Sequence, residues 1–235
     1  MAILDPDLLL RAYSIGVFPM ADSRDAPDVF WVEPKRRAIL PLERFRMSRS
    51  LRKTVRGGHF EVTTDRAFAA VVRHCASRTE TWINAAIEAS YSQLHRQGHA
   101  HSIECWSGED LVGGLYGVRL GGAFFGESMF SLRPDASKVA LAWLVARLRV
   151  GGFRLLDCQF MTPHLAGLGA VEILQKDYTA LLSAALSIGS GGAEGGGAAG
   201  VEVGALDRLL AGTAERSGGA TPPGWVIAQL LGQTS

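Results

Sequence analysis

Residues 102–130 decide the fold, and they read SIECWSGEDLVGGLYGVRLGGAFFGESMF. Three runs rich in apolar, aromatic and glycine residues, 102–106, 111–120 and 123–130, are separated by a Ser-Gly-Glu-Asp turn and a Gly-Gly pair. Short runs joined by glycine-containing turns are typical of antiparallel strands connected by hairpins. The sequence therefore predicts an antiparallel meander at the centre of the chain.

Helical patterns lie on both sides of this meander. The expected helices lie at 5–13, at 68–72 behind a capping Asp65, at 83–94, at 135–148, after Thr162-Pro163, and from a capping Asp177 to 186. Two more strands are expected at 60–64 and 153–160. Strands in the middle with helices around them predict an α+β fold: a mixed sheet flanked by helices, with a short N-terminal helical segment.

The composition allows one substantial domain. The chain has 235 residues, of which 47% are hydrophobic, and a mean hydropathy of +0.12, so it can bury a sizeable core. Residues 1–32 are too few to fold alone and must dock on that core. Residues 189–200 contain seven glycines and resemble a linker. We expect three parts: an N-terminal segment 1–32, a catalytic domain 33–187, and a linker with a C-terminal tail, 188–235.

Cysteine usage and the N-terminus indicate a cytoplasmic protein. The three cysteines lack Cys-x-x-Cys spacing, which argues against disulfides and a zinc site. The first residues lack the basic and then apolar pattern of a secretion signal, and no apolar run approaches the ~18 residues of a membrane span. His99 and His101 alternate but have no third ligand nearby, so we expect no metal.

A basic segment follows the N-terminal part. Residues 35–56 contain nine Lys and Arg against one acid, Glu43, in a chain whose net charge is only +1. Such a segment can be an ordinary solvated surface, or it can bind phosphates. We take Arg49, Arg52 and Lys53 as candidate contacts for RNA phosphates.

Polar residues interrupt two apolar strands. Asp157 and Gln159 alternate along the strand 153–160, so they share one face, and Glu127 lies between Phe125 and Phe130. A buried carboxylate needs a partner or costs several kcal/mol. The pair Asp157 and Gln159 is either a structural hydrogen-bond pair or part of an active site, and Glu127 is either an edge-strand residue or a polar anchor.

Several motifs in the same order resemble the bacterial leucyl/phenylalanyl-tRNA-protein transferase family. They are YSIGVFP at 13–19, TWI at 81–83, GHAHSIE at 98–104, LVGGLYG at 111–117, GESMFS at 126–131 and DCQ at 157–159. The resemblance implies a GNAT-like (acyl-CoA N-acyltransferase-like) fold. It implies transfer of Leu or Phe from aminoacyl-tRNA to the N-terminal Arg or Lys of acceptor proteins, with some transfer of Met. Such products are N-degrons, which an adaptor hands to a protease. No cofactor is implied.

The resemblance also implies site residues. Asp157, Gln159 and Glu127 become the catalytic candidates, with Glu127 anchoring an ammonium group of the donor or of the acceptor. The candidates for binding the substrate and the 3′ end of the tRNA are Tyr13, Trp82, Tyr91, Leu115, Phe125, Met129 and Leu144. The aromatic ones can equally be core residues. Many relatives carry Trp where this chain has Met20, so stacking at that position is weakened or replaced by a thioether contact.

Two other functions remain open at this point. A CoA-dependent N-acetyltransferase would use a glycine-rich pyrophosphate loop, which His164-Leu-Ala-Gly-Leu-Gly169 approaches with His in place of Gln or Arg. A non-catalytic module that binds tRNA or peptides would keep the basic segment and the aromatics but would not need Asp157 and Gln159.

Overall fold

The computed structural model describes residues 3–189, 201–217 and 223–232. Its described helices are α1 (Pro6–Ser14), α2 (Arg49–Arg56), α3 (Phe68–Ala76), α4 (Ala85–Arg96), α5 (Ala136–Val150), α6 (Pro163–Gly167), α7 (Gln175–Leu186), α8 (Ala205–Ser217) and α9 (Pro223–Leu230). Its described strands are β1 (Phe18–Met20), β2 (Phe30–Val32), β3 (Arg36–Ile39), β4 (Glu61–Thr64), β5 (Ala100–Ser107), β6 (Asp110–Leu120), β7 (Ala123–Ser131), β8 (Leu155–Gln159) and β9 (Val171–Leu174).

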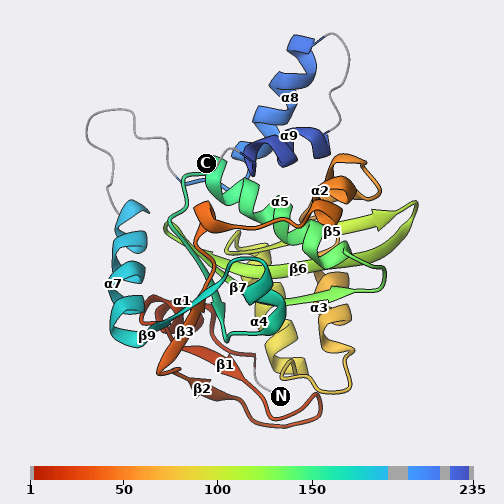
Figure 1. Ribbon diagram of the computed structural model, residues 1–235. Coiled ribbons are helices and arrows are strands. Elements are labelled where there is room, and N and C mark those ends of the chain that lie inside the picture. Colours follow the sequence, from red (N-terminus) through yellow and green to blue (C-terminus); the bar gives the residue numbers. More distant parts are fainter. Residues whose placement is uncertain (1–2, 190–200, 218–222, 233–235) are drawn as a thin grey trace.

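A seven-stranded sheet with the order β4-β5-β6-β7-β8-β3-β9 forms the centre of the molecule (Figure 1). The neighbours β7 and β8 run parallel, and the other neighbours run antiparallel. Strands β5, β6 and β7 are the expected meander. The expectation of an α+β fold with a mixed sheet flanked by helices is therefore confirmed.

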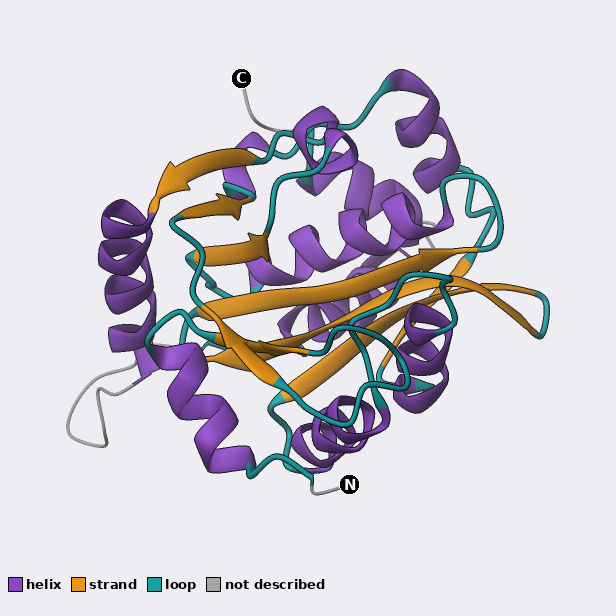
Figure 2. Cartoon of the chain, turned by 90° about the horizontal axis from the view of Figure 1, so that it is seen from below, coloured by secondary structure: helices purple, strands orange, loops and turns teal. Residues whose placement is uncertain are grey.

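Helices cover both faces of this sheet, as Figure 2 shows from below. Helix α5 packs on β5, β6 and β7, and α3 packs on the same strands. Neighbouring residues enter separate cores: Leu115 and Phe124 lie in the cluster with α5, while Tyr116 and Phe125 lie in the cluster with α3 and α4. This alternation is the period-2 pattern of a strand buried on both faces.

Strands β7 and β8 separate soon after they meet. Their parallel pairing covers only three residue pairs, from Ala123 with Leu155 to Phe125 with Asp157. The β6–β7 register shifts after Tyr116, where Gly117 pairs with Gly126. A Cβ on Gly117 would lie 2.3 Å from the carbonyl oxygen of Phe125, so only glycine fits. Such a bulge bends and twists a strand, and here it lies at the point where β7 parts from β8.

The N-terminal segment packs against the core. Leu9 and Tyr13 of α1 and Phe18 of β1 are buried in the cluster that contains α3 and α4. Helix α1 begins as its sequence predicts, with Asp5 accepting a hydrogen bond from the amide of Leu8 and Pro6 in the first turn. Its contacts with α4, α7 and β6 bring residues near position 13 to the side of the sheet where β7 and β8 separate.

The described parts of the C-terminal tail also pack on the core. Leu206 of α8 and Ile227 of α9 are fully buried in the α5 cluster. Arg147 of α5 donates hydrogen bonds of 2.6 Å to both carboxylate oxygens of Asp207. The glycine-rich stretch expected to be a linker lies, from residue 190 to residue 200, outside the described residues. The division into three parts stays a prediction, and the tail contributes side chains to the same core.

The structure departs from the sequence prediction in four strands, two helices and two caps. Strands β1, β2, β3 and β9 and helices α2 and α9 were not predicted, and β3 inserts between β8 and β9. Asp65 does not cap α3, whose N-cap is Ala67, and instead accepts a hydrogen bond from the amide of Ser102. Asp177 lies inside the first turn of α7. Among the described residues, no helix has the length and apolar character needed to cross a membrane.

Candidate functional site

A cavity of about 400 Å³ lies where β7 and β8 separate. Its walls come from both strands beyond their pairing, from β6, from α5 and from the segments around α6 and before α4. The lining residues are Arg78, Trp82, Leu115, Tyr116, Gly126, Glu127, Ser128, Met129, Leu141, Leu144, Leu156, Cys158, Gln159, Phe160, Thr162, His164 and Leu165. Ligands of open α/β sheets bind in the crevice beyond the carboxyl ends of the strands, which is where this cavity lies.

The apolar part of the wall comes from four elements. Leu115 and Met129 face the cavity from β6 and β7, Leu141 and Leu144 from α5, and Leu156 from β8. Except for the half-buried Met129, these side chains are buried in the α5 cluster. A mainly apolar wall with a few convergent polar groups is typical of a ligand pocket.

Glu127 is the buried acid of the cavity. Its Oε1 accepts hydrogen bonds from the hydroxyl of Tyr13 at 2.7 Å and from Nε2 of Gln159 at 2.9 Å, and its Oε2 accepts one from Tyr91 at 2.9 Å. The two hydroxyl oxygens also lie within hydrogen-bond distance of each other, but each hydroxyl has one proton, so both donate to Glu127 only when neither donates to the other. Burial raises the pKa of Glu127 to about 7, although the three donors oppose the shift. The carboxyl group is therefore poised to change charge near neutrality.

Gln159 ends β8 in an unusual backbone conformation. Its φ is 62°, in the left-handed region that costs a non-glycine residue about 1–2 kcal/mol. This conformation carries its amide toward Glu127, while its backbone N–H donates a 2.8 Å hydrogen bond to Oδ1 of Asp157. Asp157 therefore holds the backbone of Gln159 rather than its side chain. A strained backbone that points a polar group into a cavity is a common feature of functional sites.

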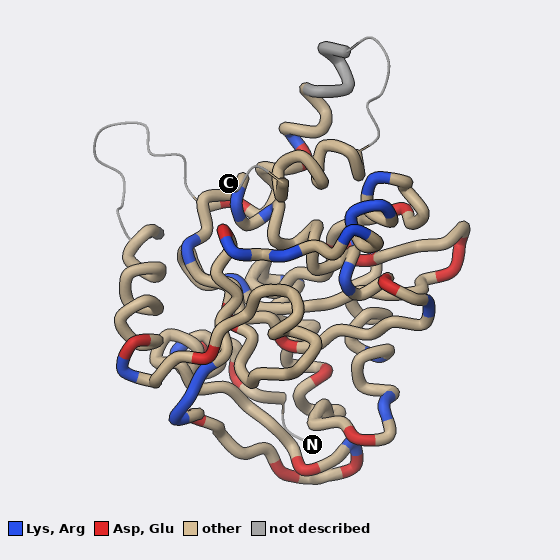
Figure 3. Tube along the Cα trace, viewed as in Figure 1, with Lys and Arg blue, Asp and Glu red and all other residues tan. Residues whose placement is uncertain are grey.

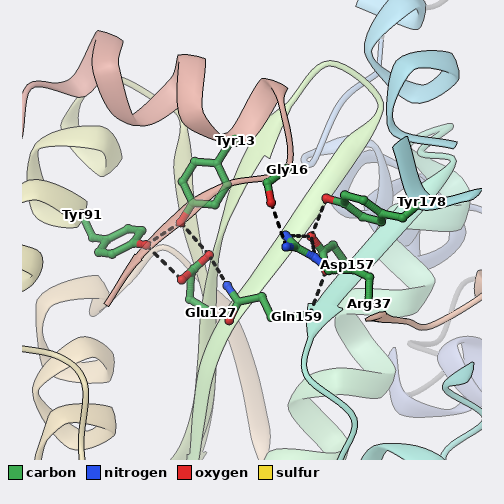
Figure 4. Close-up of polar contacts among 8 residues, drawn as sticks. All are labelled: Tyr13, Gly16, Arg37, Tyr91, Glu127, Asp157, Gln159 and Tyr178. Atoms are coloured by element: carbon green, nitrogen blue, oxygen red, sulfur yellow. Dashed lines mark hydrogen bonds and ion pairs between the residues drawn. The ribbon is translucent and has the colours of Figure 1, made fainter. Parts of the chain in front are cut away.

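A buried ion pair lies behind Gln159 (Figure 4). Nε of Arg37 donates to both oxygens of Asp157 at 2.9 and 3.0 Å, and Nη2 donates to Oδ2 at 2.5 Å. The hydroxyl of Tyr178 donates to the same Oδ2 at 2.8 Å. The side chains of Arg37 and Asp157 are 1% and 0% exposed. Both carboxylate oxygens of Asp157 thus accept hydrogen bonds from buried groups, and Asp157 does not line the cavity.

Arg37 joins four parts of the chain at this point. Its Nη1 donates a 2.8 Å hydrogen bond to the carbonyl of Gly16, and its guanidinium lies between the rings of Phe18 and Tyr178, at 4.7 and 4.5 Å from their centroids. Burial lowers the pKa of Arg37, but the hydrogen bonds and charge of Asp157 outweigh it and hold that pKa above its ordinary value. The sequence analysis missed this residue as a site component.

Other polar groups surround the cavity. Arg78 hydrogen-bonds to the hydroxyl of Ser128, and both line the wall. The buried hydroxyl of Tyr116 and Nε2 of His164 have no hydrogen-bond partner among the described residues. Burial, with a smaller effect of Lys138, lowers the pKa of His164, and burial raises the pKa of the Cys158 thiol. These groups are neutral near pH 7, so Arg78 and Glu127 supply the charges of the wall.

The predicted site residues divide into two groups. Glu127, Gln159, Trp82, Leu115, Met129 and Leu144 line the cavity. Tyr13, Tyr91, Phe125 and Asp157 do not, and all four side chains are fully buried. The rings of Tyr13 and Phe125 pack on each other with centroids 4.8 Å apart, on the opposite face of the sheet from Leu115. Tyr13 and Tyr91 are therefore placed to hold Glu127 and not to stack on a base.

The basic segment divides in a similar way. Arg37 is buried with Asp157, and Arg36 pairs with Glu172. Arg49, Arg52 and Lys53 are exposed on α2, where basic residues gather in Figure 3. The described ranges contain no group of three or more His, Cys, Asp and Glu side chains placed to hold a metal ion.

Comparisons with known proteins agree with each other. The family model described as leucyl/phenylalanyl-tRNA protein transferase matches residues 39–183, and the model of the N-terminal domain of that transferase matches residues 2–35. The chain is 62% identical to the leucyl/phenylalanyl-tRNA--protein transferase of Rhizorhabdus wittichii over 100% of both chains. It is 54% identical to that of Novosphingobium aromaticivorans over 99% of this chain and 97% of the relative.

A solved structure is similar at a lower level. It is that of a functionally unknown conserved protein from Staphylococcus epidermidis, with a TM-score of 0.41 and 8% sequence identity, covering 74% of this chain and 66% of that protein.

Proposed function

The chain belongs to the leucyl/phenylalanyl-tRNA protein transferase family, and from this premise we propose how its cavity serves the family's reaction. It is an aminoacyltransferase that moves Leu or Phe from aminoacyl-tRNA to the N-terminus of an acceptor protein. The observation that carries the proposal is one cavity with an apolar wall, a buried carboxyl and a glutamine amide, between strands β7 and β8.

The apolar wall binds the side chain of the transferred residue. Leu115, Met129 and Leu144 surround a space that accepts Leu or Phe. One missing or additional methylene changes binding in such a pocket by only ~1–3 kcal/mol, so Met is a weaker donor residue. The acceptors are proteins that begin with Arg or Lys, and their products are N-degrons for an adaptor and a protease.

Glu127 anchors an ammonium group, either that of the donor amino acid or that of the acceptor. Support comes from its burial beside the apolar wall and from three donors that fix its orientation. The groups that hydrogen-bond to Glu127 are neutral hydroxyls and an amide, so its carboxylate form has no paired cation and is available for a cationic ligand. Tyr13 and Tyr91 act through Glu127 as positioning residues.

The chemical step is aminolysis of an ester. The nitrogen of the acceptor's α-amine attacks the carbonyl carbon, the bond from that carbon to the ribose oxygen breaks, and the ribose oxygen takes up the proton that the amine loses. The ester is already activated, so alignment of the two substrates accounts for most of the catalysis. The amide of Gln159 contacts the attacking amine or polarises the carbonyl.

The buried ion pair positions Gln159. Asp157 accepts the backbone N–H of Gln159, and Arg37 and Tyr178 hold Asp157. Four hydrogen bonds from charged or phenolic donors leave this carboxylate little freedom to move. We therefore assign Asp157 a positioning role in place of direct contact with substrate.

The 3′ end of the tRNA enters past Trp82, which is half-buried in the cavity wall and offers a ring face to the terminal adenine. Arg49, Arg52 and Lys53 bind phosphates of the same tRNA. The separation of the parallel neighbours β7 and β8 around the cavity supports a GNAT-like catalytic domain at residues 33–187.

One experiment tests this function directly. Purified protein is incubated with Leu-tRNA, Phe-tRNA or acetyl-CoA and with peptides that differ only in residue one. We expect Leu and Phe to be added to peptides that begin with Arg or Lys, and no acetyl group to be added, as read by mass spectrometry. Acetylation, or aminoacyl transfer independent of residue one, would contradict the proposal.

A second prediction concerns pH. If Glu127 binds an ammonium group as a carboxylate, kcat/KM should rise with pH through about 7, because the carboxyl is neutral below its raised pKa and charged above it. Glu127→Gln should be slow at every pH and should keep only the rise at about pH 8 that comes from deprotonation of the acceptor's α-amine, since glutamine does not titrate. The measurement is the pH profile of kcat/KM from pH 5.5 to 9 with saturating peptide.

A modified donor shows whether Glu127 binds the ammonium group of the donor or that of the acceptor. N-acetyl-Phe-tRNA has no donor ammonium, so wild type should use it poorly if Glu127 binds the donor, whereas Glu127→Gln should hardly distinguish it from Phe-tRNA. Equal use of both donors by the wild type would assign Glu127 to the acceptor. A wild-type profile without a step near 7 would remove the anchoring role.

A further inference from the structure

Helix α9 packs directly beside the basic helix α2. Gly224 allows this approach, because a Cβ at that position would lie 2.0 Å from the carbonyl oxygen of Val55. Ile227 and Ala228 are buried in the same cluster as Leu51 and Val55. Two segments that are about 170 residues apart in the sequence therefore form one surface, visible in Figure 1 where α9 lies next to α2.

A groove of about 450 Å³ lies between the two helices. Its side chains are those of Arg49, Arg52, Lys53, Arg56 and Trp225, with Gly57 at one end; we call it the α2–α9 groove. The four cations are exposed, and within the described ranges none of them forms a salt bridge. The groove therefore holds a concentrated positive charge without a compensating acid.

Trp225 places an aromatic ring among these charges. Its side chain is 43% exposed, and the guanidinium carbon of Arg56 lies 5.7 Å from its ring centroid. An exposed indole offers a large ring face on which a base can stack. Cations that bind phosphates next to a ring that stacks on bases form the usual combination of a single-stranded nucleic-acid site.

We propose that the α2–α9 groove binds the aminoacyl-tRNA away from its 3′ end, with Trp225 stacking on an unpaired base or its sugar and with the cations on neighbouring phosphates. The inference rests on the proposed function, and it gives the C-terminal tail a role in RNA binding. Helices α2 and α9 both pack on α5, whose Leu141 and Leu144 line the cavity. Helix α5 has 15 residues and is about 22 Å long, so one tRNA can reach both sites.

Other anionic partners fit the groove less well. A membrane surface is bound by a broad apolar face flanked by cations, whereas Trp225 is the one large apolar side chain that is exposed among the described residues of α2 and α9. An acidic peptide would pair with the cations but would leave the ring of Trp225 without a function. RNA uses both features.

The test uses the full-length protein and two donors. Phe-tRNA reaches both the groove and the cavity, whereas phenylalanyl-adenosine, a single nucleoside, reaches only the cavity. Trp225→Ala should weaken tRNA binding between about fivefold and a hundredfold, the range for loss of one stacked base, and should raise KM for Phe-tRNA. Its rate with phenylalanyl-adenosine should equal that of the wild type. Trp225→Phe should restore most of the affinity, since a phenyl ring also stacks.

The salt dependence of tRNA binding distinguishes the contribution of the Trp225 ring from that of the cations. Lys53→Ala should reduce the slope of log Kd against log salt by about one, whereas Trp225→Ala should leave that slope unchanged, because stacking releases no counterions. Trp31→Ala is the matched control, since Trp31 is 39% exposed on β2 and lies outside the groove. It should bind tRNA like the wild type.

Three outcomes would overturn the inference. The first is tRNA affinity of Trp225→Ala within twofold of the wild type. The second is an equal loss of rate with phenylalanyl-adenosine, which would make Trp225 a structural residue. The third is binding of phosphatidylglycerol vesicles that depends on Trp225 while tRNA binding does not. A wild-type protein that uses neither donor would instead contradict the proposed function.

Discussion

Asp157→Ala is expected to lower the free energy of unfolding by about 3–5 kcal/mol, the usual cost of breaking a buried ion pair on one side. The variant leaves the guanidinium of Arg37, which is 1% exposed, without its counter-charge and removes the acceptor for Tyr178 and for the backbone of Gln159. Turnover should fall as well, because Gln159 loses its support. Urea unfolding monitored by circular dichroism measures the first effect.

An apolar double variant is the control for this prediction. Arg37→Met alone should be destabilising to a similar extent, whereas the double variant Arg37→Met with Asp157→Leu should recover much of the loss, because two apolar residues of similar volume replace both charges. Asp157→Ala with wild-type stability and lost turnover would contradict the positioning role and would place this carboxylate in the chemical step.

Gln159→Ala is expected to lower kcat by about 10²- to 10³-fold, the range for removal of one donor that stabilises developing charge in an active site. The amide of Gln159 is the neutral donor that faces both Glu127 and the cavity. KM for Phe-tRNA should change little, since the apolar wall and the RNA contacts remain. Single-turnover rates with saturating Phe-tRNA and an Arg-initiated peptide measure the effect.

Gln159→Gly distinguishes the amide from the backbone. Glycine removes the same side chain but relieves the strain of φ 62°, so it should be about 1 kcal/mol more stable than the alanine variant. Both variants should be equally slow if the amide carries the effect. If the glycine variant were as fast as the wild type, the conformation at this position, and not the amide, would matter for the reaction.

The sequence predicted the parts of the fold that depend on local pattern. The meander of β5, β6 and β7 follows from apolar runs with glycine turns. Thr162 caps α6 as predicted, because its hydroxyl oxygen accepts a hydrogen bond from the backbone N–H of Leu165. Strands β3 and β9 have only four residues each, and their pairing joins distant segments. Such pairing is set by tertiary contacts and leaves little trace in a short window. Asp65 was wrongly predicted to cap a helix because its actual partner, the amide of Ser102, is also distant in the sequence.

The residues that line the candidate site were largely predicted, but the buried cation behind them was not. Glu127 and Gln159 were found because polar residues interrupt apolar strands, and Leu115, Met129 and Leu144 followed from the family resemblance. Arg37 was counted with the exposed basic residues, although the rule that a buried carboxylate needs a partner called for a cation near Asp157. Its sequence neighbours are basic, and only the position of β3 beside β8 shows which of them is buried.

The central position of β3 has a consequence during synthesis. Arg37 and Asp157 are 120 residues apart, and β3 lies between two strands that the ribosome makes after it. At about 5–20 residues per second, Arg37 waits roughly 7–30 s for β9 to emerge. During this interval the nascent chain holds an unpaired basic strand and an incomplete sheet. The sheet that carries the site is complete only after β9, which ends at Leu174 of the 235 residues, has been translated, so products truncated before this strand should have no activity.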